Sequence, residues 1–205
     1  RKTIKDHKRI LFNGNGYEEA WIKEATEKRG LCNYPTTPDC MPHLLDKKNV
    51  DMLTSHKVFS VAELESRCEI MLENYCKAVT IEANTMIDMA RKEILPAVEG
   101  YVSELAKTVA AKKAVAPGIP CAYETGLVEK LSTLTDQIAV KTDELEDALL
   151  ELKGISDVKE ESFAIRDTVL GKMAALRAVA DEAETQTSEK YWPFPTYGEL
   201  LFGVR

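Results

Sequence analysis

The sequence contains no apolar stretch of the length that a membrane span requires. A spanning helix needs about 20 mostly apolar residues, and no uncharged apolar run in the 205-residue chain approaches that length. A charged segment followed by an apolar one, which is typical of a signal peptide, is also missing. We therefore expect no membrane partner and a cytoplasmic location.

Positive charge is not concentrated in any part of the chain. The 27 Lys and Arg residues are scattered among 34 Asp and Glu residues, and the net charge is -7. Proteins that follow a nucleic-acid backbone usually present a basic face. The charge pattern therefore predicts no nucleic-acid partner.

Side chains that commonly bind metals or act as nucleophiles are sparse, with three histidines and five cysteines. Cys32, Cys40 and His43 come nearest to a ligand set, but their spacing matches no usual zinc pattern and a fourth ligand is missing. Cys68 and Cys76 lie on one face of a predicted helix, about 12 Å apart along its axis, which is too far for a disulfide. We expect reduced, mostly packed thiols and no metal site.

Two further patterns resemble functional sites without meeting their requirements. The segment 12–17, Phe-Asn-Gly-Asn-Gly-Tyr, is predicted to be a turn, since it lacks the glycine spacing and the lysine of nucleotide-binding loops. A run of carboxylates could suggest a metal site or an acid pair, but such runs on long helices are usually solvated. This run comprises Asp143, Glu144, Glu146 and Asp147. We therefore predict no catalytic, cofactor-binding or metal-binding residue in the chain.

The strongest positive signal is a helical pattern over residues 60–113. Ser60 and Glu63 have the spacing of a capping box, which marks a helix start. Apolar residues then recur at steps of three and four, and a helix of this length would extend about 80 Å. Pro96 lies inside the pattern, where it removes a backbone hydrogen bond, and it predicts a kink rather than an end.

The remaining segments predict an all-α fold, a long antiparallel three-helix bundle with one extended, kinked helix. Prolines make 31–42 an irregular linker, and Gly30 is expected to end the helix before it. Short links between the long helices favour antiparallel neighbours. The expected helices besides 60–113 cover 18–29, 42–46, 48–56, 123–153 and 158–190. The apolar stripe of 123–153 falters at Lys141 and Thr142, which argues against a free-standing coiled coil.

We expect three parts: short helices and the linker over 1–59, the bundle over 60–190, and an irregular aromatic tail over 191–205. The first long helix exceeds its partners in length, so its end at 60–81 needs cover from the short helices or from another subunit. The opening residues form a helix-like string without a start signal, and the chain therefore looks like part of a longer protein.

The tail carries five of the fourteen aromatic residues of the chain. This is too much apolar surface for a free end, so we expect the tail to dock. It caps the bundle's own core or reaches a neighbouring domain or subunit. The residues expected to dock are Trp192, Phe194, Tyr197, Leu200, Leu201 and Phe202.

Three sequence elements carry a resemblance to a known family. The tail, YWPFPTYGELLFGV over 191–204, resembles the ending of type III glutamine synthetases. The 12–17 turn resembles a segment that follows the catalytic barrel of the same family, as do Leu64-Glu65-Ser66-Arg67 and Glu73-Asn74-Tyr75. The resemblance covers the whole chain, and the tail and the 12–17 turn are its most specific elements.

The resemblance implies a parent enzyme that joins ammonia to glutamate with ATP and Mg²⁺ or Mn²⁺, in a dodecamer of two stacked hexameric rings. The family's substrate, nucleotide and metal residues belong to the earlier barrel, and none can be carried over to this chain. It lacks the aspartate-glycine-serine signature, the lysine-proline nucleotide motif and the arginine-bearing element that closes the active site. By itself the chain is expected to be inactive and to hold no cofactor.

Two hypotheses of function follow. The first is a non-catalytic structural domain whose partners are the catalytic barrel of the parent chain and neighbouring subunits. The second is a regulatory or ligand-binding module, with a pocket near Pro96 or under the N-terminal helices that senses a metabolite or a partner protein.

Overall fold

The computed structural model describes residues 1–203, apart from the side chain of Tyr197, and those residues form helices and connecting segments without strands. The predicted all-α class is confirmed. The chain divides into two compact units, Arg1–Cys68 and Glu69–Arg205, with the boundary inside a helix. Within the described range, no helix combines the length and the hydropathy of a bilayer span.

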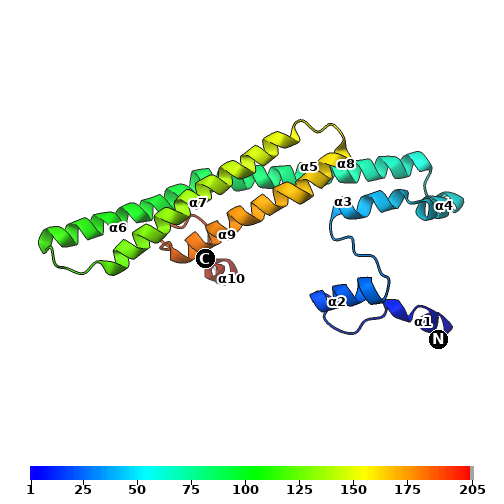
Figure 1. The fold of residues 1–205 in the computed structure, drawn as a ribbon, viewed down its shortest axis with the longest axis horizontal. Coiled ribbons are helices and arrows are strands. Elements are labelled where there is room, and N and C mark those ends of the chain that lie inside the picture. The colour runs from blue at the N-terminus through cyan, green and yellow to red at the C-terminus, as the bar shows by residue number, and fades with distance from the viewer. Residues whose placement is uncertain (204–205) are drawn as a thin grey trace. The chain divides into compact units, whose positions relative to one another are not determined.

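The first unit begins with short helices (Figure 1). They bury almost no side chains. These are α1 (Lys2–Asp6), the 3₁₀ turn η1 (Lys8–Ile10), α2 (Glu19–Lys23) and the π-helical turn η2 (Glu24–Lys28). Gly30 has φ +61°, and the Leu31 amide donates to the Ala25 carbonyl at 2.9 Å. The predicted glycine end of this helix is therefore confirmed, although its last turn is π-helical.

The predicted linker 31–42 is too long, because a helix already starts at Thr37. The remaining elements of the stretch are α3 (Thr37–Cys40), the 3₁₀ turn η3 (Met41–Leu45) and α4 (Lys47–Ser55). Thr36 caps α3 by accepting from the Asp39 amide at 3.3 Å. Pro38 lies in the first turn of α3, where its missing amide hydrogen costs no helical hydrogen bond.

Helix α5 (Val61–Met89) starts at the predicted capping box. Glu63 Oε2 accepts from the Ser60 amide at 2.7 Å, and the Glu63 amide donates to Ser60 Oγ at 3.3 Å. Leu64 is fully buried, and Cys68 Sγ contacts the Met41 carbonyl at 3.4 Å in the same unit. The first turns of α5 therefore pack against the segment that follows α3.

The capping box makes the stability of α5 depend on pH. Hydrogen bonds from the Ser60 backbone and side chain lower the pKa of Glu63. A carboxyl group whose pKa is lower in the folded state stabilises the fold at pH values above its unfolded pKa of about 4.3. This stabilisation is lost as the pH falls through the folded-state pKa. We expect Glu63→Gln to be less stable than the wild type at neutral pH and equally stable in acid. Urea unfolding across this pH range tests this, and a constant difference would contradict it.

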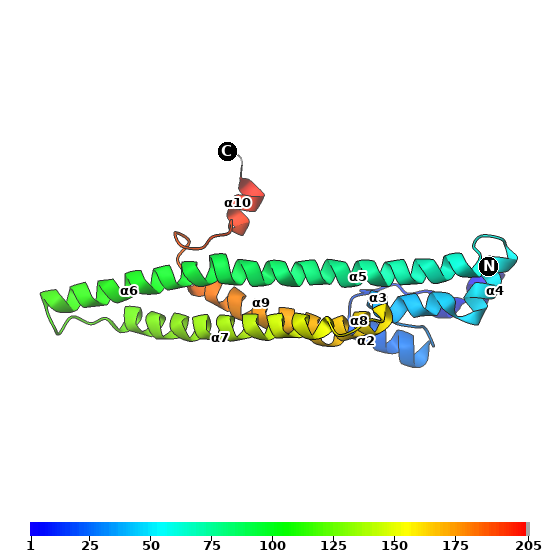
Figure 2. The same cartoon turned by 90° about the horizontal axis from the view of Figure 1, so that it is seen from above.

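In the second unit, α5 continues through the π-helical turn η4 (Ala90–Ile94) into α6 (Leu95–Val115). The Leu95 amide donates to the Ala90 carbonyl, one residue further back than in an α-helix. The helix predicted over 60–113, with a kink at Pro96, is therefore π-helical just before this proline. Figure 2 shows that the helical path continues past this point, as expected for an interior proline that does not end the helix.

The return helices are α7 (Ala122–Leu152), α8 (Val158–Ala164), the π-helical turn η5 (Ile165–Val169) and α9 (Leu170–Gln186). Helix α7 packs against α6 and α9, and both views show these helices side by side (Figures 1 and 2). Asp157 caps α8 by accepting from the Glu160 amide at 2.9 Å. The last long helix ends at Gln186, so the prediction that it reaches residue 190 is wrong.

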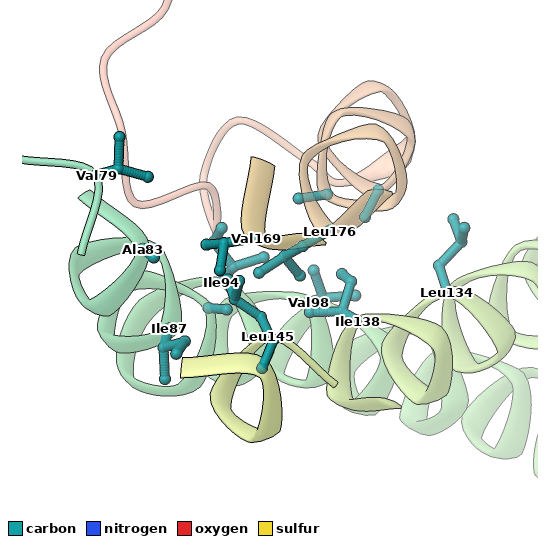
Figure 3. Close-up of a cluster of buried hydrophobic side chains, with 14 of the residues drawn as sticks. Val79, Ala83, Ile87, Ile94, Val98, Leu134, Ile138, Leu145, Val169 and Leu176 are labelled. Atoms are coloured by element: carbon teal, nitrogen blue, oxygen red, sulfur yellow. The ribbon is translucent and has the colours of Figure 1, made fainter. Parts of the chain in front are cut away.

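The core of this unit lies between these helices (Figure 3). Val98, Ile138, Leu145 and Val169 are fully buried in it. Thr142 is also buried, and its Oγ1 donates to the Ile138 carbonyl at 2.7 Å. The stripe of α7 therefore continues through Thr142, because the hydroxyl is satisfied within its own helix.

Candidate functional site

The base of the C-terminal tail is fixed to α6. Lys190 Nζ lies 3.3 Å from Glu104 Oε2, and the Tyr191 hydroxyl donates to the same carboxylate. The Tyr191 ring lies 5.5 Å from the ring of Tyr101. A Cβ added at Gly100 would lie 3.3 Å from Tyr191 Cδ1, so glycine leaves the space in which this ring rests. The tail therefore leaves the domain from a defined point.

The next two aromatic residues of the tail pack against the core of their own unit. Trp192 and Phe194 are half-buried and contact the core cluster. Their rings meet edge to face with centroids 6.1 Å apart, a favourable aromatic geometry. This part of the tail covers apolar surface between the end of α5 and α9.

The last part of the tail forms the helix α10 (Tyr197–Phe202), so the expectation of an irregular tail is wrong here. Thr196 Oγ1 accepts from the Glu199 amide at 3.2 Å, and Glu199 Oε2 accepts from the Thr196 amide at 2.9 Å. A Cβ at Gly203 would lie 2.2 Å from the Glu199 carbonyl oxygen, so the helix end requires glycine. The Thr-x-x-Glu spacing, equivalent to that of Ser60 and Glu63, was the signal that could have predicted this helix.

The side chains of α10 do not join the core. Leu200, Leu201 and Phe202 are 67%, 71% and 80% exposed. The Tyr197 side chain, also predicted to dock, lies outside the described residues. The structure thus brings Trp192 and Phe194 together on the bundle and leaves the three apolar residues of α10 exposed. Sequence reasoning did not identify Gly100, Glu104 and Tyr191, which hold the base of the tail.

A cavity of about 300 Å³ lies beside the docked part of the tail. Met86 and Met89 of α5, Ala180 of α9, and both Trp192 and Phe194 contribute to its walls. Ile94 and Leu176 also line it, and Figure 3 shows both in the core cluster. The cavity therefore lies next to the π-helical turn that precedes Pro96.

Three carboxylates of the α7 run, Asp143, Glu144 and Glu146, form ion pairs. Arg91 Nη2 donates to Asp143 Oδ1 at 2.8 Å and to Glu146 Oε2 at 2.5 Å. Glu144 pairs with Lys141 at 2.9 Å and with Lys172 of α9 at 3.4 Å. Hydrogen bonds from Arg91 lower the pKa of Glu146. These ion pairs therefore join α7 to η4 and α9.

Two of the three residues considered as metal ligands, His43 and Cys32, have other contacts. His43 stacks on Tyr34 with ring centroids 4.1 Å apart, and its Nδ1 lies 3.0 Å from Asp46 Oδ2. A hydrogen bond with Cys32 raises the pKa of Tyr34, while Cys40 is an exposed free thiol. Across residues 1–203, no three His, Cys, Asp or Glu side chains are grouped as a metal site would require.

The predicted turn over 12–17 is present and is held by an aromatic stack. Phe12 lies on Trp21 with ring centroids 3.8 Å apart, and the Arg29 guanidinium lies 4.7 Å from the Trp21 ring. Arg29 Nη1 also donates to the Leu11 carbonyl at 2.6 Å. A Cβ at Gly14 would lie 2.6 Å from Phe12 Cζ, so this glycine permits the ring to fold over the turn.

Comparison with known proteins gives matches to one family. Residues 1–113 match the family described as the glutamine synthetase C-terminal domain. The chain is 40% identical over 205 residues to a glutamine synthetase of Butyrivibrio fibrisolvens, covering 100% of this chain and 29% of the relative. It is 31% identical over 209 residues to a type-3 glutamine synthetase of Dictyostelium discoideum, covering 98% of this chain and 28% of the relative. The chain thus spans less than a third of the length of these relatives.

Proposed function

The chain belongs to the glutamine synthetase C-terminal domain family, and on this basis we propose that it is a non-catalytic assembly domain of a type III glutamine synthetase. In this proposal the parent enzyme joins ammonia to glutamate with ATP and Mg²⁺ or Mn²⁺ on a separate catalytic barrel. The parent is a cytoplasmic dodecamer. We propose that residues 1–59 cover the start of the long helix and that residues 60–190 form the bundle. Residues 191–205 form the docking tail.

The observation that carries this proposal is the exposed apolar surface of α10. Its Leu200, Leu201 and Phe202 side chains are more than two-thirds exposed, although a capping box holds the helix. Burying each such side chain would contribute about 1.5–3 kcal/mol. A helix that is formed and apolar, yet not packed on its own domain, is typical of an interface.

The base of the tail supports the same function. Glu104, Gly100 and the Trp192–Phe194 pair fix where the chain leaves the bundle. A fixed base reduces the entropy lost when α10 binds a partner. We therefore propose that Trp192 and Phe194 anchor the tail, and that Tyr197 and the apolar residues of α10 contact the barrel or a neighbouring subunit.

The proposal is tested in the full-length parent enzyme by replacing Leu200, Leu201 and Phe202 together with serine. We expect smaller oligomers by light scattering, because the interface loses its apolar contacts. The matched control replaces three exposed apolar residues of α7, Tyr123, Val140 and Leu150, with serine. An unchanged oligomer in the α10 variant would contradict the proposal, whereas dissociation of the control alone would assign the interface to α7.

A further inference from the structure

The cavity beside the tail has an apolar interior. Its lining includes Met86, Met89, Ile94, Leu176, Trp192 and Phe194. A volume of about 300 Å³ is at the lower end of the range for small-molecule pockets. Methionine side chains adapt to ligands of different shape, and π-helical turns such as η4 often occur at functional sites. The cavity therefore has the size and the lining for a small, largely apolar ligand.

The charged residues of the lining restrict which ligand it can accept. They are Arg177, Asp181 and Glu184, all on α9. Arg177 Nε donates to Asp181 Oδ2 at 3.4 Å, so these two charges compensate each other. Glu184 adds one further negative charge. An anion such as a nucleotide or a dicarboxylate would be repelled by Glu184. It would gain little from Arg177, because this arginine is already paired with Asp181.

We propose that this cavity binds a small organic cation, an amine with an aromatic or aliphatic body. The apolar body lies among the methionines and Leu176. The ammonium group lies at the rim, beside Glu184 and against the ring of Trp192. A cation at an indole ring and beside a carboxylate is favoured at partly exposed sites. The site belongs to the chain itself and is independent of the assembly role of α10.

Trp192 provides a direct signal for binding. The chain has two tryptophans, and Trp21→Phe leaves Trp192 as the only tryptophan, whose emission is excited selectively over that of tyrosine. The variant is titrated with phenethylamine and, separately, with hydrocinnamate, which joins a carboxylate to a similar phenyl-alkyl body. We expect the amine to bind about tenfold more tightly than the carboxylate. Equal affinities, or no change in Trp192 fluorescence with either compound, would overturn the proposal.

Two substitutions locate the binding site. Glu184→Gln should reduce the preference for the amine by about threefold, whereas Glu129→Gln, an exposed carboxylate of α7 outside the lining, should leave it unchanged. Ala180→Phe should fill the cavity and abolish binding of the amine. Circular dichroism checks the fold of each variant. If Ala180→Phe does not fold, the comparison of Glu184→Gln with Glu129→Gln decides whether the amine binds at this cavity. Equal effects of the two glutamate variants would overturn the proposal.

A second possible occupant of the cavity is the apolar face of α10 that belongs to another copy of the chain. The test must distinguish this occupant from a free amine. Ending the chain after Pro195 removes α10 and retains the whole cavity lining. We expect the affinity for phenethylamine to be unchanged by this truncation and independent of protein concentration. A concentration-dependent affinity that rises on truncation would assign the cavity to α10 and overturn the small-cation proposal.

Discussion

Replacing Leu145 with alanine is expected to lower the free energy of unfolding by about 2–5 kcal/mol. Leu145 is fully buried in the core that α7 shares with its neighbours, and it follows Ile138 and Thr142 in the α7 stripe (Figure 3). The substitution removes apolar contacts and leaves a space that packed helices only partly close. Domains of this size are stable by about 5–15 kcal/mol, so much of the stability would be lost. Urea unfolding followed by circular dichroism measures the change.

Leu150 provides a matched control on the same helix, because it is the same residue type and is 51% exposed. Leu150→Ala should cost at most about 1 kcal/mol, as is usual for surface positions. Both substitutions replace leucine with alanine within α7, so their difference reports mainly burial. Similar losses at the two positions would contradict the description of the core given by the structure.

The sequence identifies those features of the fold that depend on local chemistry. The Ser60–Glu63 capping box and the left-handed Gly30 were predicted because each acts within a few residues. The same local rule would have predicted α10 from Thr196 and Glu199, but the prolines before it suggested an irregular tail. Helix starts and ends were therefore largely accessible from sequence.

Features that depend on contacts between distant segments were not accessible in this way. The carboxylates of α7 appeared to be a solvated run, because the sequence does not show that Arg91 lies beside Asp143 and Glu146. Likewise, Tyr191 follows the last long helix in sequence, yet it packs at Gly100 of α6. The cavity at Trp192 arises from three segments, and its lining residues share no sequence pattern.

The π-helical turns illustrate a third case, in which the sequence held a signal that is difficult to read. The buried residues around Pro96 recur mostly at steps of four, namely Val79, Ala83, Ile87, Ala90, Ile94 and Val98. An α-helix has 3.6 residues per turn, so steps of four drift around it. The i→i−5 hydrogen bond from Leu95 to Ala90 accommodates an additional residue in the turn and keeps the stripe on one face.

Inserting one alanine after Lys92 is therefore expected to destabilise the domain by about 3–6 kcal/mol. The π-helical turn η4 already holds one additional residue, so a second one would rotate α6 by about 100° relative to α5. Val98 and Leu105, both buried on the α6 stripe, would turn away from the core. Each would forgo about 1.5–3 kcal/mol of burial. Urea unfolding of the insertion variant measures this loss.

The control is Lys92→Ala, which keeps the residue count of η4. Lys92 is exposed, and its Nζ lies 2.8 Å from Asp88 Oδ2 one turn earlier. Such a surface pair contributes at most about 0.5 kcal/mol, so the substitution should be nearly silent. If the insertion were equally silent, the helix would have absorbed the second additional residue without rotating α6. The residue count of η4 would then have no part in aligning Val98 and Leu105 with the core.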